Sequence, residues 1–197
     1  MSTKKKIKLI AARLYAEKGF KGMTLKEIAD EAGIKPPSIY AFYSGKKDLF
    51  LQTYKEILDD HLHLLKGQFE HRDTYSARET LHQILLIIMT YHMEETEKTK
   101  MFIRLMLFPP SFLKEDISEY FHNLENMERR MLKKIFDEGI TNEEIQFRDT
   151  EALVTAYLCL LDGLFLETQY YDKEEFFRRL ESIWEQYWAG IAVNRNC

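Results

Sequence analysis

The stretch TLKEIADEAGIKPPSIYAFYSGKKDLF, residues 24–50, decides the fold that we expect for this chain. Thr24 is followed three residues later by Glu27, which is the spacing of a capping box, so a helix begins at Thr24. The helix runs to about Ala32, because Gly33 supplies the left-handed backbone that commonly ends a helix. A tight turn at Gly33 is therefore expected.

A short second helix follows the turn. Pro36 and Pro37 stand in its first turn, where a helix does not need backbone amide hydrogens, and it ends near Tyr43. So short a helix is marginal in water and must be held by its neighbours, here a preceding helix over residues 4–18 that ends at Gly19. A helix, a tight turn and a second helix form a helix-turn-helix, whose second helix enters the major groove of DNA.

The charge is divided unevenly along the chain. Residues 1–50 hold 11 Lys and Arg against 5 Asp and Glu, so they carry +6, and residues 51–197 carry −10 of the total of −4. A basic N-terminal part joined to an acidic remainder indicates that only the N-terminal part approaches a polyanion. A solvated basic face without a partner is the alternative.

The rest of the chain is also predicted to be helical. A long helix is capped by Ser44 and runs toward His71, and another begins at the capping box of Ser76 and Glu79. The second of these is apolar on nearly every side, which predicts a buried central helix. No strand pattern competes, so the expected fold class is all-α. Further helices are expected over residues 99–107, 114–138 (ended by Gly139), 149–170 and 172–193.

Composition excludes a secreted or membrane-spanning protein. Cys159 and Cys197 have no CxxC spacing, so we expect no disulfide and a reducing, cytoplasmic location. Charged residues interrupt the N-terminal stretch that a signal peptide would need. The longest apolar run, residues 84–89, is far shorter than the ~20 residues that span a bilayer. No membrane partner is expected.

Residues 11–50, AARLYAEKGFKGMTLKEIADEAGIKPPSIYAFYSGKKDLF, resemble the tetracycline-repressor (TetR) family of bacterial transcriptional regulators. The resemblance implies an N-terminal three-helix DNA-binding head over residues 1–48 and a helical ligand-binding and dimerisation domain over residues 49–197. The positions that carry the resemblance are Phe20, Thr24, Ile28, Ala29, Ala32, Gly33, Ile34, Ile39, Tyr40, Lys46 and Leu49.

The same resemblance implies which residues contact DNA. The residues facing the bases would be Lys35, Pro36, Pro37, Ser38 and Ala41, and those holding phosphates would be Thr24, Tyr40 and Lys46. The helix starts at Thr24 and Lys46 offer free amides and partial positive charge to a phosphate. Phe42 and Ser44 depart from the family pattern. Since the reading helix has no Arg, a bidentate contact to guanine would have to come from Lys35.

The last two helices are implied to form a dimeric four-helix bundle. Gly163 permits close helix approach although it lowers helix propensity by ~1 kcal/mol, and the final helix carries more aromatic surface than its own core needs. The expected interface residues are Ala156, Leu160, Gly163, Leu164, Phe177, Leu180, Trp184 and Trp188.

A pocket for a small, largely hydrophobic effector is expected in the second domain. Flexible and aromatic side chains adapt to a ligand, although each of them can equally be ordinary core. Arg104 is costly in an apolar bundle unless an acidic side chain or an acidic ligand pairs with it, so neutral, cationic and anionic effectors all stay open. The expected lining is Met89, His92, Met93, Met101, Phe102, Arg104, Leu105, Phe108 and Tyr157.

The alternative function is a small helical carboxylate/histidine metal protein or enzyme. Glu79 with His82, and Glu119 with His122, have the spacing that di-iron bundles use. With 22 Glu and 6 His among 197 residues, chance alone gives about 0.7 such pairs, so two are unremarkable, and no other catalytic or metal motif accompanies them. We therefore expect no enzyme, no cofactor and no metal, but a repressor that binds a palindromic operator as a homodimer and is released by its effector.

Overall fold

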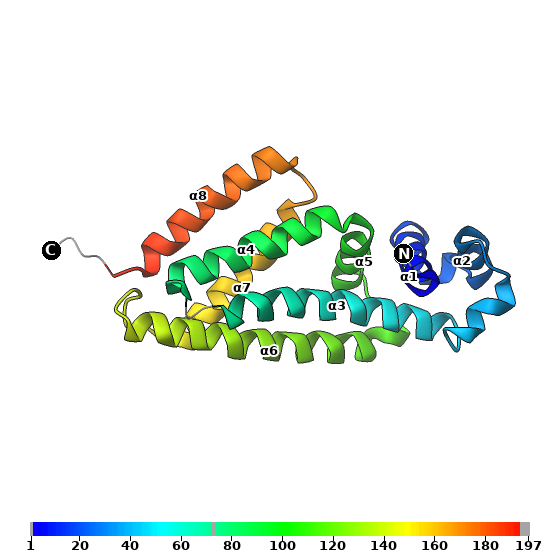
Figure 1. Cartoon of the computed structure of the whole chain (residues 1–197), viewed down its shortest axis with the longest axis horizontal. Helices are drawn as coiled ribbons and strands as arrows, with labels where there is room; N and C mark the ends of the chain where they lie inside the picture. Colours follow the sequence, from blue (N-terminus) through cyan, green and yellow to red (C-terminus); the bar gives the residue numbers. More distant parts are fainter. Residues whose placement is uncertain (1, 72–73, 194–197) are drawn as a thin grey trace. The chain divides into compact units, whose positions relative to one another are not determined.

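The structure, a computed structural model, describes residues 2–71 and 74–193. It confirms the all-α fold class (Figure 1). Within the described residues, the only strand-like pairing is a single antiparallel bridge between Ile145 and Ala192. The elements in chain order are α1 (Thr3–Gly22), α2 (Leu25–Ala32), the 3-10 helix η1 (Pro36–Ala41), α3 (Lys46–Glu70), α4 (Ala77–Glu94), α5 (Thr96–Leu107), the 3-10 helix η3 (Ser111–Leu113), α6 (Lys114–Thr141), α7 (Thr150–Glu167) and α8 (Lys173–Ile191).

The helices form two compact units. The first unit comprises Met1–Asp60 and Glu95–Asn123, and the second comprises His61–Glu94 and Leu124–Cys197. Each unit is discontinuous in sequence, because the long helices α3 and α6 contribute residues to both. The domain boundary predicted between residues 48 and 49 stays a prediction.

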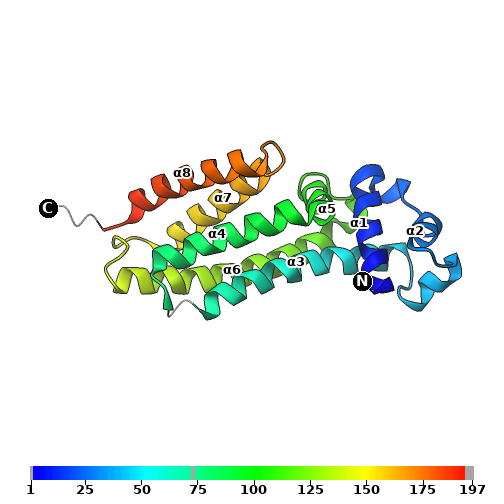
Figure 2. The ribbon, with the colours of Figure 1, turned by 45° about the horizontal axis from the view of Figure 1, so that its top comes forward.

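The first unit is built on α1, which packs against α2 and α5 (Figures 1 and 2). Ser2 caps α1 by accepting a hydrogen bond from the amide of Lys5, 3.3 Å away. Gly19 interrupts the helix with φ of 70° and ψ of 176°, at the residue where the sequence predicts that the first helix ends. The buried core of this unit includes Ile7, Ala11, Leu14, Tyr15, Ile28, Ile39, Leu49 and Phe50.

The second unit is built around α4, which contacts α7 and α8 and lies between α8 and α6 in both ribbon views. Its capping box is formed as predicted: the Glu79 amide donates to Ser76 Oγ at 3.2 Å, and the Ser76 amide donates to Glu79 Oε2 at 2.9 Å. The side chains of α4 that are fully buried are Leu81, Ile84, Leu85, Ile88 and Met89. The expectation of a central helix is thus consistent with its packing.

The predicted helix end at Gly139 is wrong. Gly139 does not end α6, which continues to Thr141, and the left-handed residue after it is Glu143 with φ of 58°. A Cβ on Gly139 would lie 2.7 Å from Ile145 Cδ1 and 2.8 Å from Ala77 Cβ, so this glycine permits a close approach of two segments. A glycine inside a helix can serve packing rather than termination, and sequence spacing does not separate the two.

Ser44 does not cap α3, because the helix begins one residue later than expected. The Leu49 amide donates to Gly45 O at 3.0 Å, so Gly45 occupies the cap position. Ser44 instead donates its amide to Asp48 Oδ2 at 2.7 Å. The hydrogen bonds from Gln52 and Ser44 lower the pKa of the Asp48 carboxyl.

Candidate nucleic-acid interface and effector cavity

The helix-turn-helix forms as the sequence predicts. Thr24 Oγ1 accepts a hydrogen bond from the Glu27 amide at 3.1 Å and so caps α2. Gly33 has φ of 75°, and its amide donates to Asp30 O at 3.1 Å while the Ile34 amide donates to Ala29 O at 3.0 Å. These bonds satisfy the last carbonyl groups of α2 and fix the direction in which the chain leaves the helix.

The second element of the motif is a 3-10 helix that ends at Ala41, two residues before the predicted end. Pro36 and Pro37 occupy its first two positions, and the Ser38 amide donates to Lys35 O at 2.8 Å. Ile39 is completely buried and anchors the element to the first unit. An element of this length cannot be stable alone, so its position depends on that anchor.

The side chains around this anchor are available to a partner. Tyr40 is 62% exposed, while Tyr43 is buried and donates its hydroxyl to Lys4 O at 3.4 Å. Burial raises the pKa of Tyr43 to about 12, with smaller contributions from nearby carboxylates. The other exposed residues of the predicted DNA-contacting set are Thr24, Lys35, Pro37, Ser38 and Ala41, and Pro36 is half-buried.

The side chain of Lys46 is held in place by two contacts of its ammonium group. Its Nζ donates to Met23 O at 2.7 Å and lies 4.6 Å from the centre of the Phe20 ring. Partial burial lowers its pKa. The ammonium group is therefore fixed at the start of α3, next to the capped start of α2.

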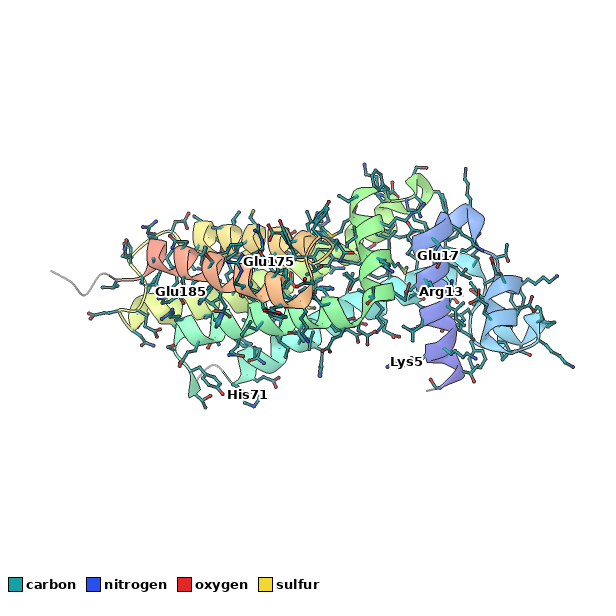
Figure 3. All side chains as sticks on the ribbon, turned by 90° about the horizontal axis from the view of Figure 1, so that it is seen from above. Lys5, Arg13, Glu17, His71, Glu175 and Glu185 are labelled. Carbon is teal, nitrogen blue, oxygen red and sulfur yellow. The ribbon has the colours of Figure 1, made fainter. Side chains whose placement is uncertain are left out.

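Much of the positive charge in the first 50 residues is paired inside the first unit. Lys8 Nζ lies 2.5 Å from Glu56 Oε2, Arg13 contacts both Glu17 and Glu31, and Lys18 contacts Glu27. Figure 3 shows Arg13 and Glu17 together on α1. Counting charges along the sequence does not reveal this pairing. Within residues 2–50, the exposed lysines without an ion pair to a described residue are Lys4, Lys5, Lys21, Lys26 and Lys35.

Residues 10–53 match the family model described as bacterial regulatory proteins, tetR family, and these are the residues that form the helix-turn-helix and its supports. Over these residues the chain is similar to this family. One relative, from Bacillus subtilis (strain 168), is the "Probable HTH-type transcriptional regulator YttP"; it is 25% identical over 194 residues, which are 98% of this chain and 92% of that protein.

Two further comparisons, with transcriptional regulators, extend over most of the chain. The negative transcriptional regulator IcaR of the Staphylococcus aureus biofilm operon icaADBC is 29% identical over 139 residues, covering 69% of this chain and 72% of IcaR. The solved structure of the transcriptional regulator FadR from Bacillus subtilis, in complex with stearoyl-CoA, has a TM-score of 0.72 at 19% identity and covers 95% of this chain and 98% of its own. These relatives are thus named as regulators of transcription.

A cavity of about 330 Å³ lies in the first unit. Its polar lining residues are Lys114, Ser118 and His122, all on α6. Sequence reasoning missed these three, although their spacing of four residues places them on one face of the helix. The apolar lining residues are Tyr54, Leu105, Met106, Pro109, Ile117 and Phe121.

The residues predicted to line an effector pocket are divided between the two units. Met101, Phe102, Arg104, Leu105 and Phe108 belong to the first unit, and Met89, His92, Met93 and Tyr157 belong to the second. Of these, only Leu105 lines the 330 Å³ cavity. Phe108 is 74% exposed, so the expectation that it lines a buried pocket does not fit the structure. Tyr157 is fully buried and donates its hydroxyl to Leu81 O at 2.6 Å.

Among the described residues, Arg104 makes no ion pair with the acidic side chain that the sequence suggested. Its Nη1 donates to Ala16 O at 2.7 Å, and its guanidinium lies 5.7 Å from the centre of the Tyr15 ring. A backbone carbonyl and an aromatic face therefore satisfy this cation. Its charge gives no information about the effector.

A buried polar cluster in the second unit was not predicted. His61 of α3 is 6% exposed, and its Nε2 lies 3.0 Å from Glu128 Oε1 of α6, although within the described residues neither ring nitrogen makes a well-directed hydrogen bond. The ring of His92 on α4 lies 5.5 Å from that of His61. Burial, and then the neighbouring His61, hold the pKa of His92 well below its usual 6.5. One sequence signal could have indicated this cluster: a polar residue that interrupts the apolar face of a helix. Glu128, four residues after Leu124 and four before Leu132, is an example.

The predicted dimer residues differ in their exposure. Leu164, Leu180 and Trp184 are buried within the chain, and Trp188 is 9% exposed, so these four pack in the core of the second unit. Gly163 and Ala156 are exposed, and Leu160 and Phe177 are half-buried. Most of the aromatic side chains of α8 are therefore buried in the core of the same chain. This differs from the sequence-based expectation that α8 carries more aromatic surface than this core could bury.

The remaining features bear on the alternative function and the location of the chain. His82 Nε2 lies 3.1 Å from Glu181 Oε1, and its ring stacks on Trp184. Among the described residues, no group of three His, Cys, Asp or Glu side chains could hold a metal ion. None of the helices in residues 2–71 and 74–193 is long and apolar enough to cross a membrane. Cys159 is exposed, and Cys197 lies outside the described residues.

Proposed function

We propose that this chain is a transcriptional repressor that binds a palindromic DNA operator as a homodimer and leaves it when a small, largely hydrophobic effector binds. The observation that carries this proposal is the helix-turn-helix itself, with exposed polar side chains around one buried anchor, Ile39. The name of the relative IcaR, a negative transcriptional regulator, favours repression over activation. Such a regulator would act on the chromosome, in the cytoplasm.

We assign the DNA contacts to the exposed face around η1. Lys35, Pro36, Pro37, Ser38 and Ala41 would face base edges in the major groove. Thr24, Tyr40 and Lys46 would hold phosphates, which position the protein without reading sequence. The fixed ammonium of Lys46 and the capped start of α2 support this assignment, because both present positive potential at defined places.

The homodimer is assigned to α7 and the adjoining residues of α8. Ala152, Ala156, Cys159, Gly163 and Leu166 are exposed, and their spacings of three and four residues place them on one face of α7. A Cβ on Gly163 would meet nothing within 4 Å, so packing inside the chain does not explain this glycine. A second copy that approaches α7 closely would explain it, with Leu160 and Phe177 beside the contact.

The effector is assigned to the first unit's cavity, which contains Leu105 from the predicted set. The relative FadR was solved with stearoyl-CoA, which supports a small-molecule effector with an apolar part. The other predicted lining residues, Met89, His92, Met93, Met101, Phe102 and Tyr157, stay a prediction for a cavity that would have to open on binding. An effector releases DNA only if it binds the form with lower DNA affinity more tightly.

Selection of DNA from a random pool with the full chain tests the proposed function. We expect an enriched inverted repeat whose half-sites are separated by about one helical turn. Binding to the selected DNA should weaken steeply as salt rises, because lysines displace counterions from phosphates. A pool without an enriched palindrome, together with binding that does not respond to salt, would contradict the proposal.

A further inference from the structure

The cavity of the first unit has one amphipathic wall, and α6 provides it. Lys114, Ser118 and His122 line the cavity at successive spacings of four residues, which places them along one side of the helix. Ile117 and Phe121 line the same cavity, each one residue before a member of the polar line. A polar row therefore runs beside an apolar row along the first turns of α6.

The facing walls are apolar. Leu105 and Met106 come from the last turn of α5, and Tyr54 comes from α3. Burial raises the pKa of the Tyr54 hydroxyl, so this group is neutral in the physiological range. Methionine adapts its shape to a ligand better than branched side chains do. These walls suit an aliphatic chain.

The polar row contains the cation Lys114 and has no acidic counterpart in the cavity. The residues that line the cavity include no Asp or Glu. Asp116, in the same turn as Lys114, is paired with Lys47, whose Nζ lies 2.8 Å from Asp116 Oδ2. Within the described part of the chain Lys114 makes no ion pair, and the N-terminal end of α6 adds partial positive charge beside it.

We propose that this cavity binds an amphipathic monocarboxylate, with its carboxylate at Lys114 and His122 and its aliphatic chain against Leu105, Met106 and Phe121. The volume of about 330 Å³ lies at the small end of ligand pockets, which run from about 300 to 1,000 Å³, so a chain of moderate length fits better than a bulky ligand. This proposal names the effector class for the proposed function and rests on it.

The cavity walls are joined directly to the elements that position the DNA-contacting residues. Leu105 and Met106 follow Arg104, which binds the backbone of α1 through Ala16 O. Asp116, on the helix that carries the polar row, binds Lys47 at the start of α3. A ligand that moves the end of α5 or the start of α6 would therefore strain contacts to α1 and α3 within the same compact unit.

Calorimetric titration of the full chain without DNA tests the site, with three probes of equal chain length: decanoate, 1-decanol and decylamine. Decanoate should bind about three to ten times more tightly than 1-decanol, the range expected for one or two partly exposed charge contacts, and decylamine should bind most weakly. Equal affinity for decanoate and 1-decanol would overturn the carboxylate assignment. Absence of binding by all three would overturn the site.

Variants on α6 distinguish the cavity from a non-specific apolar surface. Lys114→Gln and His122→Gln should each reduce decanoate affinity about threefold or more while leaving 1-decanol affinity unchanged. Lys133→Gln is the control, because Lys133 lies on the same helix but pairs with Asp137 and does not line the cavity. Ser118→Phe should reduce binding of decanoate and 1-decanol alike, by filling the cavity. Unchanged decanoate binding in the Lys114 and Ser118 variants would overturn the proposal.

The same protein with its selected operator separates this proposal from the proposed function. Decanoate should release the operator from the unaltered chain and from Lys133→Gln, and release by Lys114→Gln should need a higher decanoate concentration. If the operator is bound but decanoate neither binds nor releases it, the site is wrong and the regulator remains. If decanoate binds but no DNA is selected, the proposed function is wrong and the site remains.

Discussion

Arg104 on α5 and Ala16 on α1 are joined by a hydrogen bond of 2.7 Å from the guanidinium Nη1 to the backbone carbonyl. The bond falls three residues before Gly19, where α1 leaves helical geometry and its last carbonyl groups lose their partners inside the helix. The second guanidinium nitrogen, Nη2, would lie 2.9 Å from a Cβ on Gly19, so the glycine leaves room for the arginine. Arg104 thus closes the end of the regular part of α1.

Replacing Arg104 by Gln should therefore destabilise the first unit. The shorter neutral side chain leaves a carbonyl without its charged donor and removes the contact with the Tyr15 ring, which together contribute about 1–3 kcal/mol to the free energy of unfolding. Urea denaturation measures this loss. Arg78→Gln is the control, because Arg78 is exposed and its partner among the described residues is Glu185 at the surface, so its loss should cost at most about 1 kcal/mol. Equal effects of the two substitutions would contradict the structural role of Arg104.

Lys35→Ala and Ser38→Ala should each relax the DNA preference at particular base pairs, by ~1 to 3 kcal/mol, if these side chains read base edges. Lys46→Ala should instead weaken binding to all sequences alike, because it removes a fixed positive charge at the start of α3. Fluorescence anisotropy with the selected operator and single-base variants measures both effects. Lys55→Ala, an exposed lysine outside the motif on α3, should change neither. A uniform loss for Lys35→Ala would remove it from the base-reading set.

The helix-turn-helix could be predicted because its signals are local. Thr24 and Glu27 are three residues apart, and Gly33 and the two prolines act on their immediate neighbours. Such signals depend on backbone geometry within one turn, so tertiary packing rarely overrides them. The length of the second element was less predictable, since its end is decided by the burial of Ile39 rather than by a stop residue.

The partners of long side chains could not be predicted. Arg104 binds the carbonyl of a residue that lies 88 positions away in the sequence. The sequence shows that a buried guanidinium needs a partner, but it does not show which group is that partner. The apolar face of α8 posed the same difficulty. An aromatic stripe is equally suited to the core of its own chain and to a partner, and Leu180 and Trp184 are buried in their own chain. The cavity was missed because lysine and histidine on a helix usually indicate a solvated face.

Leu160→Glu should convert the proposed homodimer to a monomer. Leu160 is half-buried on the face of α7 that Ala156 and Gly163 share, and a carboxylate there would be desolvated without a partner in a dimer. Light scattering at micromolar concentration should give 23.6 kDa for the variant and twice this mass for the unaltered chain. Leu107→Glu, at a leucine of α5 that is 55% exposed, is the matched control and should leave the mass unchanged. A mass of 23.6 kDa for the unaltered chain would contradict the dimer itself.

Acid should destabilise the second unit through His92. The unfolded chain binds a proton on this imidazole near pH 6.5, whereas the folded chain binds it only at lower pH, so below about 6.5 the unfolded state holds more protons. The free energy of unfolding should therefore be constant above this pH with respect to His92 and fall below it, by up to about 1.4 kcal/mol per pH unit.

Urea denaturation between pH 7.5 and 5 measures this dependence. His92→Phe should flatten it, because phenylalanine keeps a ring against Phe165, whose centre lies 4.5 Å from that of His92, but cannot bind a proton. His61 and Glu128 face the same cluster and are present in both proteins, so the difference between the two profiles isolates His92. His63→Gln, at an exposed histidine of α3, is the control and should leave the profile unchanged. A variant profile as steep as the original would contradict the burial of a neutral His92.

Two helical glycines should respond in opposite directions to the same substitution. Gly139→Ala should lower the free energy of unfolding by about 1–3 kcal/mol, because the new Cβ would lie 2.8 Å from Ala77 Cβ, which has no freedom to move away.

Gly163→Ala has open space around the new Cβ in a single chain, so it should raise the stability of the Leu160→Glu monomer by about 0.5–1 kcal/mol through helix propensity. In the unaltered chain the same Gly163→Ala should weaken the dimer, if a second copy approaches α7 at this glycine. Urea denaturation gives the two stabilities, and sedimentation equilibrium gives the dimer dissociation constant. An unchanged dissociation constant would remove Gly163 from the interface, whereas a stabilising Gly139→Ala would contradict the close approach of α6 and the start of α4.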